Sequence, residues 1–248
     1  MSMVKVLSEY ILSLGQEAYI PNFFCKAYRP VLYIPSKEEV KELLQKMDIR
    51  TSHNSEQFRL DRECKILFLL YFCCGLRLSE GRLLKWEHID LDKGILTVLG
   101  SKGNKDRLVY LPQDSLPVLK NYKERQEMLF PGIDWAFPGK DPHKPVSCSG
   151  VESSFNRHWA MLPVARTVDK HPTPHCLRHA FVVERFNEWM HQGIDTNTML
   201  PYLSRYLGHK SPDETYYYYH LAGKAFDTIR EKDSVSGKVI PEVIPYEE

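Results

Sequence analysis

One stretch decides the expected fold and chemistry of this chain: Leu207-Gly208-His209-Lys210-Ser211-Pro212-Asp213-Glu214-Thr215-Tyr216-Tyr217-Tyr218. Ser211 has the position of a helix N-cap, Pro212 that of the first helical residue, and Glu214 lies three residues after the cap. This combination is typical of a helix start, because it satisfies backbone N–H groups that the first turn leaves unpaired. The sequence therefore predicts a helix from Pro212 to about Arg230 that carries the tyrosines.

Only one of the consecutive tyrosines on this helix can face a given partner, because successive residues point about 100° apart. The others would pack in the core or meet solvent, as an aromatic cluster on a helix usually does. A phenol with a pKa of about 10 is ionised in about one molecule per thousand at pH 7, so a reactive tyrosine needs a base and positively charged surroundings. On the residues alone, Tyr217 and Tyr218 both remain candidates for a nucleophile.

Two other segments place arginine where an anion could bind. Arg77 precedes a predicted helix start at Ser79, where free backbone N–H groups and the helix dipole favour negative charge. His175 and Arg178 follow two prolines and are expected on one face of the first turn of another helix. A guanidinium group can bind two phosphate oxygens at once, and a histidine can transfer a proton near neutral pH.

Both segments also have a structural interpretation. As a surface residue, Arg77 would pair with Glu80, and we expect Glu80 to orient Arg77 rather than to act on a substrate. His179 lies among the apolar residues of its predicted helix, such as Phe181 and Phe186. It is therefore predicted to be a packing or hydrogen-bonding neighbour outside the catalytic set.

Together these motifs resemble the tyrosine recombinase (phage integrase) family, over a region from about Ser36 to about Ile229. The resemblance implies the fold of that family's catalytic domain, which is mainly α-helical with a small antiparallel β-sheet and belongs to the α+β class. The family places its nucleophile nine residues after the histidine of Leu-Gly-His, which selects Tyr218 here and leaves Tyr217 as the second candidate.

The resemblance also assigns the catalytic roles. Members of the family use a lysine on a β-hairpin, and here the predicted strands 95–99 and 107–111 enclose Lys102 and Lys105. Lys102 matches the catalytic lysine, whereas Lys105 and Arg107 become candidates for contact with the DNA backbone. The predicted catalytic set is Arg77, Lys102, His175, Arg178, His209 and Tyr218.

The implied reaction breaks a DNA phosphodiester without a metal ion or any other cofactor. Tyr218 attacks the phosphorus while His175 accepts its proton, and Lys102 protonates the leaving 5′ oxygen. The two arginines and His209 stabilise charge on the phosphate oxygens. The resulting 3′-phosphotyrosyl link conserves the bond energy, so ATP is not needed. The paired acidic clusters of a two-metal nuclease are not evident in the sequence.

Composition narrows the class of protein further. Among 248 residues, 33 are basic and 32 acidic, so the bulk charge does not indicate nucleic-acid binding and any basic surface must be local. The six cysteines lack paired metal-ligand spacing and no secretory segment precedes them, which favours reduced thiols and a cytoplasmic location. The longest apolar run, Ile66 to Cys74, is too short to cross a membrane.

The organisation along the chain follows from helical spacing and capping signals. They predict further helices at about 4–14, 36–44, 61–74, 79–86, 116–128, 150–161, 175–191 and 197–207. We expect three regions: a remnant of an N-terminal core-binding domain plus a linker (1–35), the catalytic domain (36–233) and a C-terminal tail (234–248). A fragment of a longer protein is the favoured interpretation, and a naturally short family member is the alternative.

Three functions fit these features. The favoured one is a site-specific recombinase or integrase of a mobile element that acts on double-stranded DNA recombination sites. The resemblance implies a monomer when free, a homotetramer on DNA, accessory DNA-bending or excision proteins, and a tail that docks on a neighbouring protomer or folds back in cis. A type IB topoisomerase-like activity and a non-catalytic DNA-binding relic are the alternatives. The Leu-Gly-His segment disfavours the first of these, and the full catalytic set disfavours the second.

Overall fold

The computed structural model describes residues 3–20, 33–49, 54–101, 105–168 and 171–218. The chain divides into two compact units, Met1–Val31 and Leu32–Glu248. In the first unit, α1 (Met3–Ser13) confirms the helix predicted at about residues 4–14. Most of its apolar side chains, such as Leu7 and Tyr10, are exposed. The assignment of this region to a core-binding domain stays a prediction.

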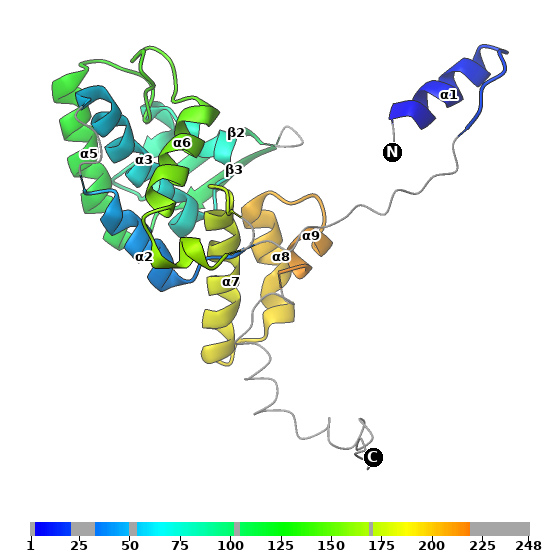
Figure 1. Ribbon diagram of the computed structural model, residues 1–248. Coiled ribbons are helices and arrows are strands. Elements are labelled where there is room, and N and C mark those ends of the chain that lie inside the picture. The colour runs from blue at the N-terminus through cyan, green and yellow to red at the C-terminus, as the bar shows by residue number, and fades with distance from the viewer. Residues whose placement is uncertain (1–2, 21–32, 50–53, 102–104, 169–170, 219–248) are drawn as a thin grey trace, which may run out of the picture. The chain divides into compact units, whose positions relative to one another are not determined.

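In the second unit, one small sheet packs against a set of helices (Figure 1). The α-helices of its described part are α2 (Lys37–Lys46), α3 (Ser55–Cys74), α4 (Leu78–Arg82), α5 (Leu116–Leu129), α6 (Cys148–Trp159), α7 (Cys176–His191), α8 (Thr196–Leu207) and α9 (Asp213–Tyr216). Short 3-10 helices are η1 (Trp86–His88), η2 (Gln113–Ser115) and η3 (Pro163–Arg166), and the strands are β1 (Ile89–Asp90), β2 (Ile95–Ser101) and β3 (Lys105–Tyr110). This architecture confirms the predicted α+β class.

The sheet is antiparallel in the order β1-β2-β3. Leu96 pairs with Val109, and both side chains are fully buried, while Leu108 and Tyr110 on the other face are exposed. One buried and one solvated face is the usual pattern of a small antiparallel sheet packed on helices. The pairing shifts between Val98 and Ser101, where the β2–β3 hairpin leaves the body of the sheet.

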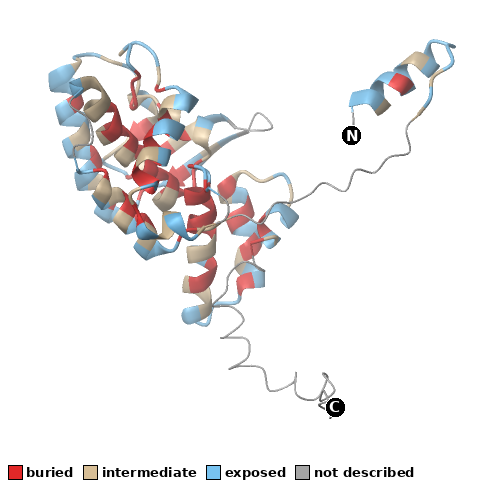
Figure 2. Ribbon diagram, in the orientation of Figure 1, coloured by how far each residue is buried: buried red, intermediate tan, exposed pale blue. Residues whose placement is uncertain are grey.

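Buried apolar side chains form two clusters, which appear as the red regions of Figure 2. The main core gathers residues of α2, α3, the sheet, α5 and α6, together with the first turn of α7 at Cys176 and Leu177. The second cluster consists of Phe181, Val182, Phe186, Leu200, Leu203, Leu207 and Tyr218. Later turns of α7 therefore hold α8 and the tyrosine segment, so that one helix connects the two cores.

Element boundaries differ from the sequence predictions where side-chain caps or short pairings decide them. The predicted capping box at Ser36 is confirmed, with the Glu39 backbone N–H donating to Ser36 Oγ at 3.2 Å. Helix α3 begins at Ser55 rather than near residue 61, because the Asn54 side chain accepts from two backbone N–H groups of the first turn. Helix α4 ends at Arg82, four residues before the predicted end, and strand β1 was not predicted.

The start of the tyrosine helix also differs in detail. Ser211 Oγ accepts from the backbone N–H of Asp213 at 3.2 Å and donates to the Asp213 carboxylate at 2.8 Å, so Asp213 rather than Glu214 is its partner. The helix begins at Asp213 with Pro212 as its N-cap residue, one position later than predicted, so the assignment of Ser211 as the N-cap was wrong. The predicted continuation from residue 219 to about Arg230 lies outside the described residues, as does the tail.

Two expectations from composition concern the described part of the chain. Its five cysteines are free thiols, and three of them, Cys64, Cys74 and Cys176, are buried. None of its helices combines the length and apolar character that a membrane span requires.

Gly75 ends α3 in the left-handed region, with φ 63°, and provides a stability test of the junction between the two cores. A Cβ atom there would lie 2.5 Å from the Phe181 ring and 3.1 Å from Leu207. We expect Gly75→Ala to lower the free energy of unfolding by about 2–5 kcal/mol, the sum of left-handed strain and overpacking. Urea unfolding followed by circular dichroism measures this loss.

Gly193→Ala is the matched control for this prediction. Gly193 also has a left-handed φ, of 70°, but nothing lies within 4 Å of an added Cβ. Its substitution should therefore cost only the strain, about 1–2 kcal/mol. Equal losses in the two variants would contradict the proposed steric contact with Phe181.

Candidate active site

Arg77 is the N-cap residue of α4, and both its backbone and its side chain are held in place. Its backbone N–H donates to Glu80 Oε2 at 2.7 Å, and its Nη1 donates to Glu80 Oε1 at 2.8 Å. Nη2 donates to the carbonyl oxygen of Gly208 at 2.6 Å, 131 positions further along the chain. These contacts join the start of α4 to the Leu-Gly-His turn after α8.

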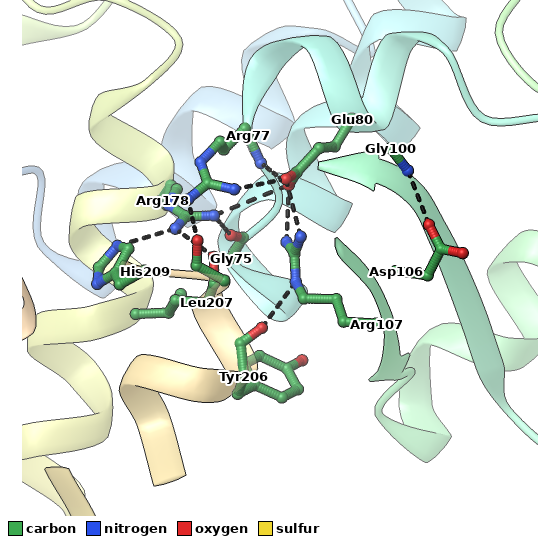
Figure 3. A network of polar contacts seen from close by, with 11 residues as sticks. Gly75, Arg77, Glu80, Gly100, Asp106, Arg107, Arg178, Tyr206, Leu207 and His209 are labelled. Carbon is green, nitrogen blue, oxygen red and sulfur yellow. Dashed lines mark hydrogen bonds and ion pairs between the residues drawn. The ribbon is translucent and has the colours of Figure 1, made fainter. Parts of the chain in front are cut away.

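Glu80 is the centre of this polar network (Figure 3). Arg107 donates to it with both terminal nitrogens, at 2.8 Å and 2.7 Å, and Arg178 Nη1 lies 3.9 Å from Oε2. Burial alone would raise the pKa of Glu80, but hydrogen bonds from Arg107 and Arg77 outweigh that effect and lower it to about 2. The carboxylate is therefore charged at neutral pH, and it supports the prediction that Glu80 orients Arg77.

Arg178 is almost completely buried, with 2% of its surface exposed. Nη1 donates to the Gly75 carbonyl at 2.5 Å, and Nη2 donates to the Leu207 carbonyl at 2.8 Å and to Nε2 of His209 at 3.0 Å. Burial and the nearby charge of Arg77 lower the pKa of Arg178 to about 10, which still leaves it charged at neutral pH. Three guanidinium groups thus meet one carboxylate, so the site carries an excess of positive charge.

The contacts of His209 define which of its ring nitrogens carries the hydrogen. Because Arg178 has only N–H donors, Nε2 of His209 must accept, and Nδ1 then donates to the hydroxyl of Thr215 at 2.7 Å. Burial and the positive charges of Arg178 and Arg77 lower the pKa of His209 to about 3. In this arrangement His209 is neutral, and protonating Nε2 would convert it into a donor at the expense of the Arg178 contact.

Tyr218 lies against this cluster with only 6% of its surface exposed. Its hydroxyl is 2.6 Å from Nδ1 of His179, and the two rings are 5.3 Å apart. Burial raises the pKa of Tyr218 to about 12, although the charge of Arg178 acts in the opposite direction. Tyr217 is partly exposed and packs edge-on against the Tyr218 ring at 5.7 Å. Tyr218 thus lies within the electrostatic influence of Arg178 and Arg77, and its assignment as the nucleophile stays a prediction.

His175 and His179 are one helical turn apart on α7, and their rings pack edge to face at 4.6 Å. His175 itself is exposed at the start of α7, yet the protein around its ring partly desolvates it, and this effect together with Arg178 lowers its pKa to about 4. No described contact joins His175 to Tyr218. Its apolar neighbours predict that His179 lies outside the catalytic set, whereas the structure places its ring against the Tyr218 hydroxyl. The spacing of four residues from His175 was the signal that could have included it.

The structure bears differently on the three predicted site residues of the hairpin. Lys102 lies outside the described residues, and Lys105 begins β3. The side chain of Arg107 is buried, and its Nε donates to the Tyr206 carbonyl at 2.8 Å. In this structure Arg107 therefore contacts Glu80 and α8, and its predicted contact with DNA stays a prediction.

A pocket of about 300 Å³ opens beside this network, between α4 and β2. Arg77, Ser79 and Glu80 line one side, and Thr97 and Gly100 of the hairpin line another. A larger pocket of about 630 Å³ between α3 and α5 contains none of the predicted site residues. In the part of the chain that the structure describes, no three His, Cys, Asp or Glu side chains are grouped as metal ligands would be.

Known proteins resemble this chain in both sequence and fold. The profile of the phage integrase family matches residues 36–224. Tyrosine recombinase XerC of Alcanivorax borkumensis is 29% identical over 223 residues, which cover 89% of this chain and 67% of XerC. Tyrosine recombinase XerA of Pyrococcus furiosus is 32% identical over 191 residues, which cover 76% of this chain and 57% of XerA. The chain therefore spans only part of the length of these relatives.

Two solved structures extend the comparison to the fold. The XerH site-specific recombinase bound to its palindromic difH substrate, in a post-cleavage complex, has a TM-score of 0.66 at 21% identity, covering 91% of this chain and 64% of that chain. The Tn1549 transposon integrase in complex with a circular intermediate DNA also has a TM-score of 0.66, at 14% identity, covering 92% and 75%. The match over residues 36–224 and the shared fold lead to one conclusion: the chain belongs to the phage integrase family, the tyrosine-type site-specific recombinases.

Proposed function

We propose that this chain cleaves and rejoins DNA through a covalent 3′-phosphotyrosyl intermediate on Tyr218. The observation that carries the proposal is the convergence of Arg77, Arg178, His209 and Tyr218, which come from four different parts of the fold. Contacts between the arginines and the 207–209 turn place this cluster next to the tyrosine segment. Such a group of donors around one nucleophile suits an anionic, tetrahedral phosphate.

Charge supports a phosphodiester as the substrate group. Arg77, Arg107 and Arg178 together exceed the single negative charge of Glu80, and a phosphodiester would offset part of that excess. Arg77 and Arg178 can each present two N–H groups to phosphate oxygens.

The proposed step exchanges one phosphoester bond for another. The hydroxyl oxygen of Tyr218 attacks the phosphorus in line, the bond to the 5′ oxygen breaks, and the phenol proton passes to a histidine. We assign protonation of the 5′ oxygen to Lys102, as the family resemblance implies. Support comes from the described Gly100 of the same hairpin, which lines the pocket that Arg77 and Glu80 also line. The reverse reaction with a second 5′ hydroxyl rejoins the DNA.

The proposed substrates are double-stranded recombination sites, and the proposed biological setting is a mobile element. The similar XerH recombinase is bound to difH, and the similar integrase of the Tn1549 transposon is bound to a circular intermediate DNA. By analogy, we assign this chain four protomers on two DNA sites, a monomeric state when free, and accessory DNA-bending or excision proteins as partners. The catalytic domain is proposed to extend from residue 36 to 233, with a tail at 234–248.

The first test of function concerns the nucleophile. Tyr218→Phe keeps the ring in the second core and removes only the hydroxyl, so folding should persist while covalent attachment to DNA is abolished. Wild-type protein would be incubated with a library of nicked duplex oligonucleotides of random sequence. Complexes that resist SDS would be isolated and their DNA used for every variant. Tyr217→Phe is the matched control and should retain attachment. Loss in Tyr217→Phe alone would assign the nucleophile to the neighbouring residue.

The second test concerns phosphate binding. Arg77→Lys and Arg178→Lys keep the charge but lose the planar pair of donors, so each should lower the single-turnover rate of covalent complex formation by about 100-fold or more. Arg185→Lys is the control, because Arg185 is a half-exposed residue on α7 that pairs with Glu188. Rates within threefold of the wild type in both site variants, a margin set at about the scatter of such measurements, would contradict the assignment.

The third test concerns metal ions. The proposed reaction uses charged side chains in place of a divalent cation, so covalent complex formation should continue at an unchanged rate in excess EDTA. The same assay with added Mg²⁺ provides the comparison. A rate that falls with chelation and recovers with Mg²⁺ would show that a metal ion takes part.

A further inference from the structure

We propose that His179, rather than His175, is the catalytic residue that accepts the proton of Tyr218 during DNA cleavage. The inference rests on the proposed function, since it concerns the same nucleophile. Its basis is geometric, because His179 Nδ1 lies 2.6 Å from the Tyr218 hydroxyl oxygen, the atom that would attack phosphorus. A general base must be within hydrogen-bond distance of the proton it removes, and His179 meets that condition in this structure.

Neighbouring groups determine which atom donates in this contact. The charged and titratable groups around His179 are His175 and Arg178 on α7, Tyr218 after α9 and His209 after α8. Burial and the positive potential of His175 and Arg178 lower the pKa of His179 to about 3. The ring is therefore neutral above that pH. With its hydrogen on Nε2, it can accept at Nδ1 from the phenol, which is protonated because its own pKa is raised.

The protein environment also explains how this base would become effective. A bound phosphodiester places a negative charge beside the arginines and reduces the positive potential that disfavours a protonated His179. During attack the Tyr218 oxygen forms its bond to phosphorus while its proton moves to Nδ1, so proton transfer and bond formation can coincide. When a 5′ hydroxyl attacks the phosphotyrosyl bond, His179 returns that proton to the tyrosine oxygen.

The neighbouring His175 is poorly placed for the same task. Its ring packs against that of His179, and His175 is an exposed residue at the N-cap position of α7. His179 is instead buried with Tyr218 next to the second core, away from competing water. Because residues four apart on a helix lie one above the other, the two histidines are separated by one helical turn.

A measurement without DNA tests the contact. In protein labelled with ¹⁵N-histidine, the chemical shifts of His179 distinguish a hydrogen on Nε2 from one on Nδ1. We expect the neutral form with hydrogen on Nε2 from pH 5 to 9, and an altered Nδ1 shift in Tyr218→Phe. A hydrogen on Nδ1 would overturn the proposal, since His179 would then donate to the tyrosine. This readout remains valid even if the proposed function fails.

Kinetics test the role in cleavage. His179→Asn places an oxygen near the position of Nδ1 and keeps a hydrogen-bond acceptor, but an amide cannot take up the proton. We expect the single-turnover rate of covalent complex formation to fall about 100-fold or more at pH 7. The rate should then rise with pH, because hydroxide must ionise the phenol. Thermal unfolding checks the fold, and His179→Gln provides a second variant if the first is unstable.

Two matched substitutions complete the comparison. His191→Asn, at the exposed end of α7, should leave the rate unchanged. His175→Asn should lower the rate less than His179→Asn and should leave the shape of the pH profile unchanged. A larger loss in His175→Asn, or a wild-type rate in His179→Asn, would overturn the proposal. Absence of covalent complex with the wild-type protein would instead count against the proposed function.

Discussion

The ion cluster at Glu80 is the interaction on which the rest of the site depends. Its carboxylate accepts from Arg77 and Arg107 and lies close to Arg178, so it holds three like charges within one small volume. Without a negative group at this point, the guanidinium groups would repel one another and lose their relative orientation. The cluster is therefore both a support for the fold, because it connects α4, β3 and α7, and the source of a positive site.

The arginines of this cluster also connect the two cores through hydrogen bonds to backbone carbonyls. Arg178 donates to carbonyls at the ends of α3 and α8, and Arg77 donates to the turn that follows α8. The ends of helices leave such carbonyl groups unpaired, and here arginines satisfy them. Helix α8 thereby becomes fixed relative to α3, and the tyrosine segment that follows α8 packs onto α7 beside the arginines.

The arginines of the site and the neighbouring histidines influence each other's charge. The arginines that we propose as a phosphate site also disfavour protonated histidines. The pKa values of His175, His179 and His209 are all lowered by burial and by Arg178. A negative charge beside the arginines would reverse part of that effect. Histidines that are neutral beforehand could then become donors or proton carriers when a phosphodiester binds, which links binding to chemistry without a conformational switch.

Local signals in the sequence predicted most of the helices, the hairpin and the family, because caps, helical spacing and motif distances act over a few residues. They also singled out Arg77, Arg178 and Tyr218 as candidates for the site. These signals correctly predicted the capping box at Ser36. They missed the N-cap at Asn54 and the two-residue strand β1, because neither has a distinctive local sequence pattern. Only the tertiary structure revealed the contacts of Arg107 and His179. Arg107 is buried on Glu80, and His179 faces Tyr218, 39 positions away along the chain. Such pairings depend on how distant elements pack, and spacing along one element carries no information about that packing.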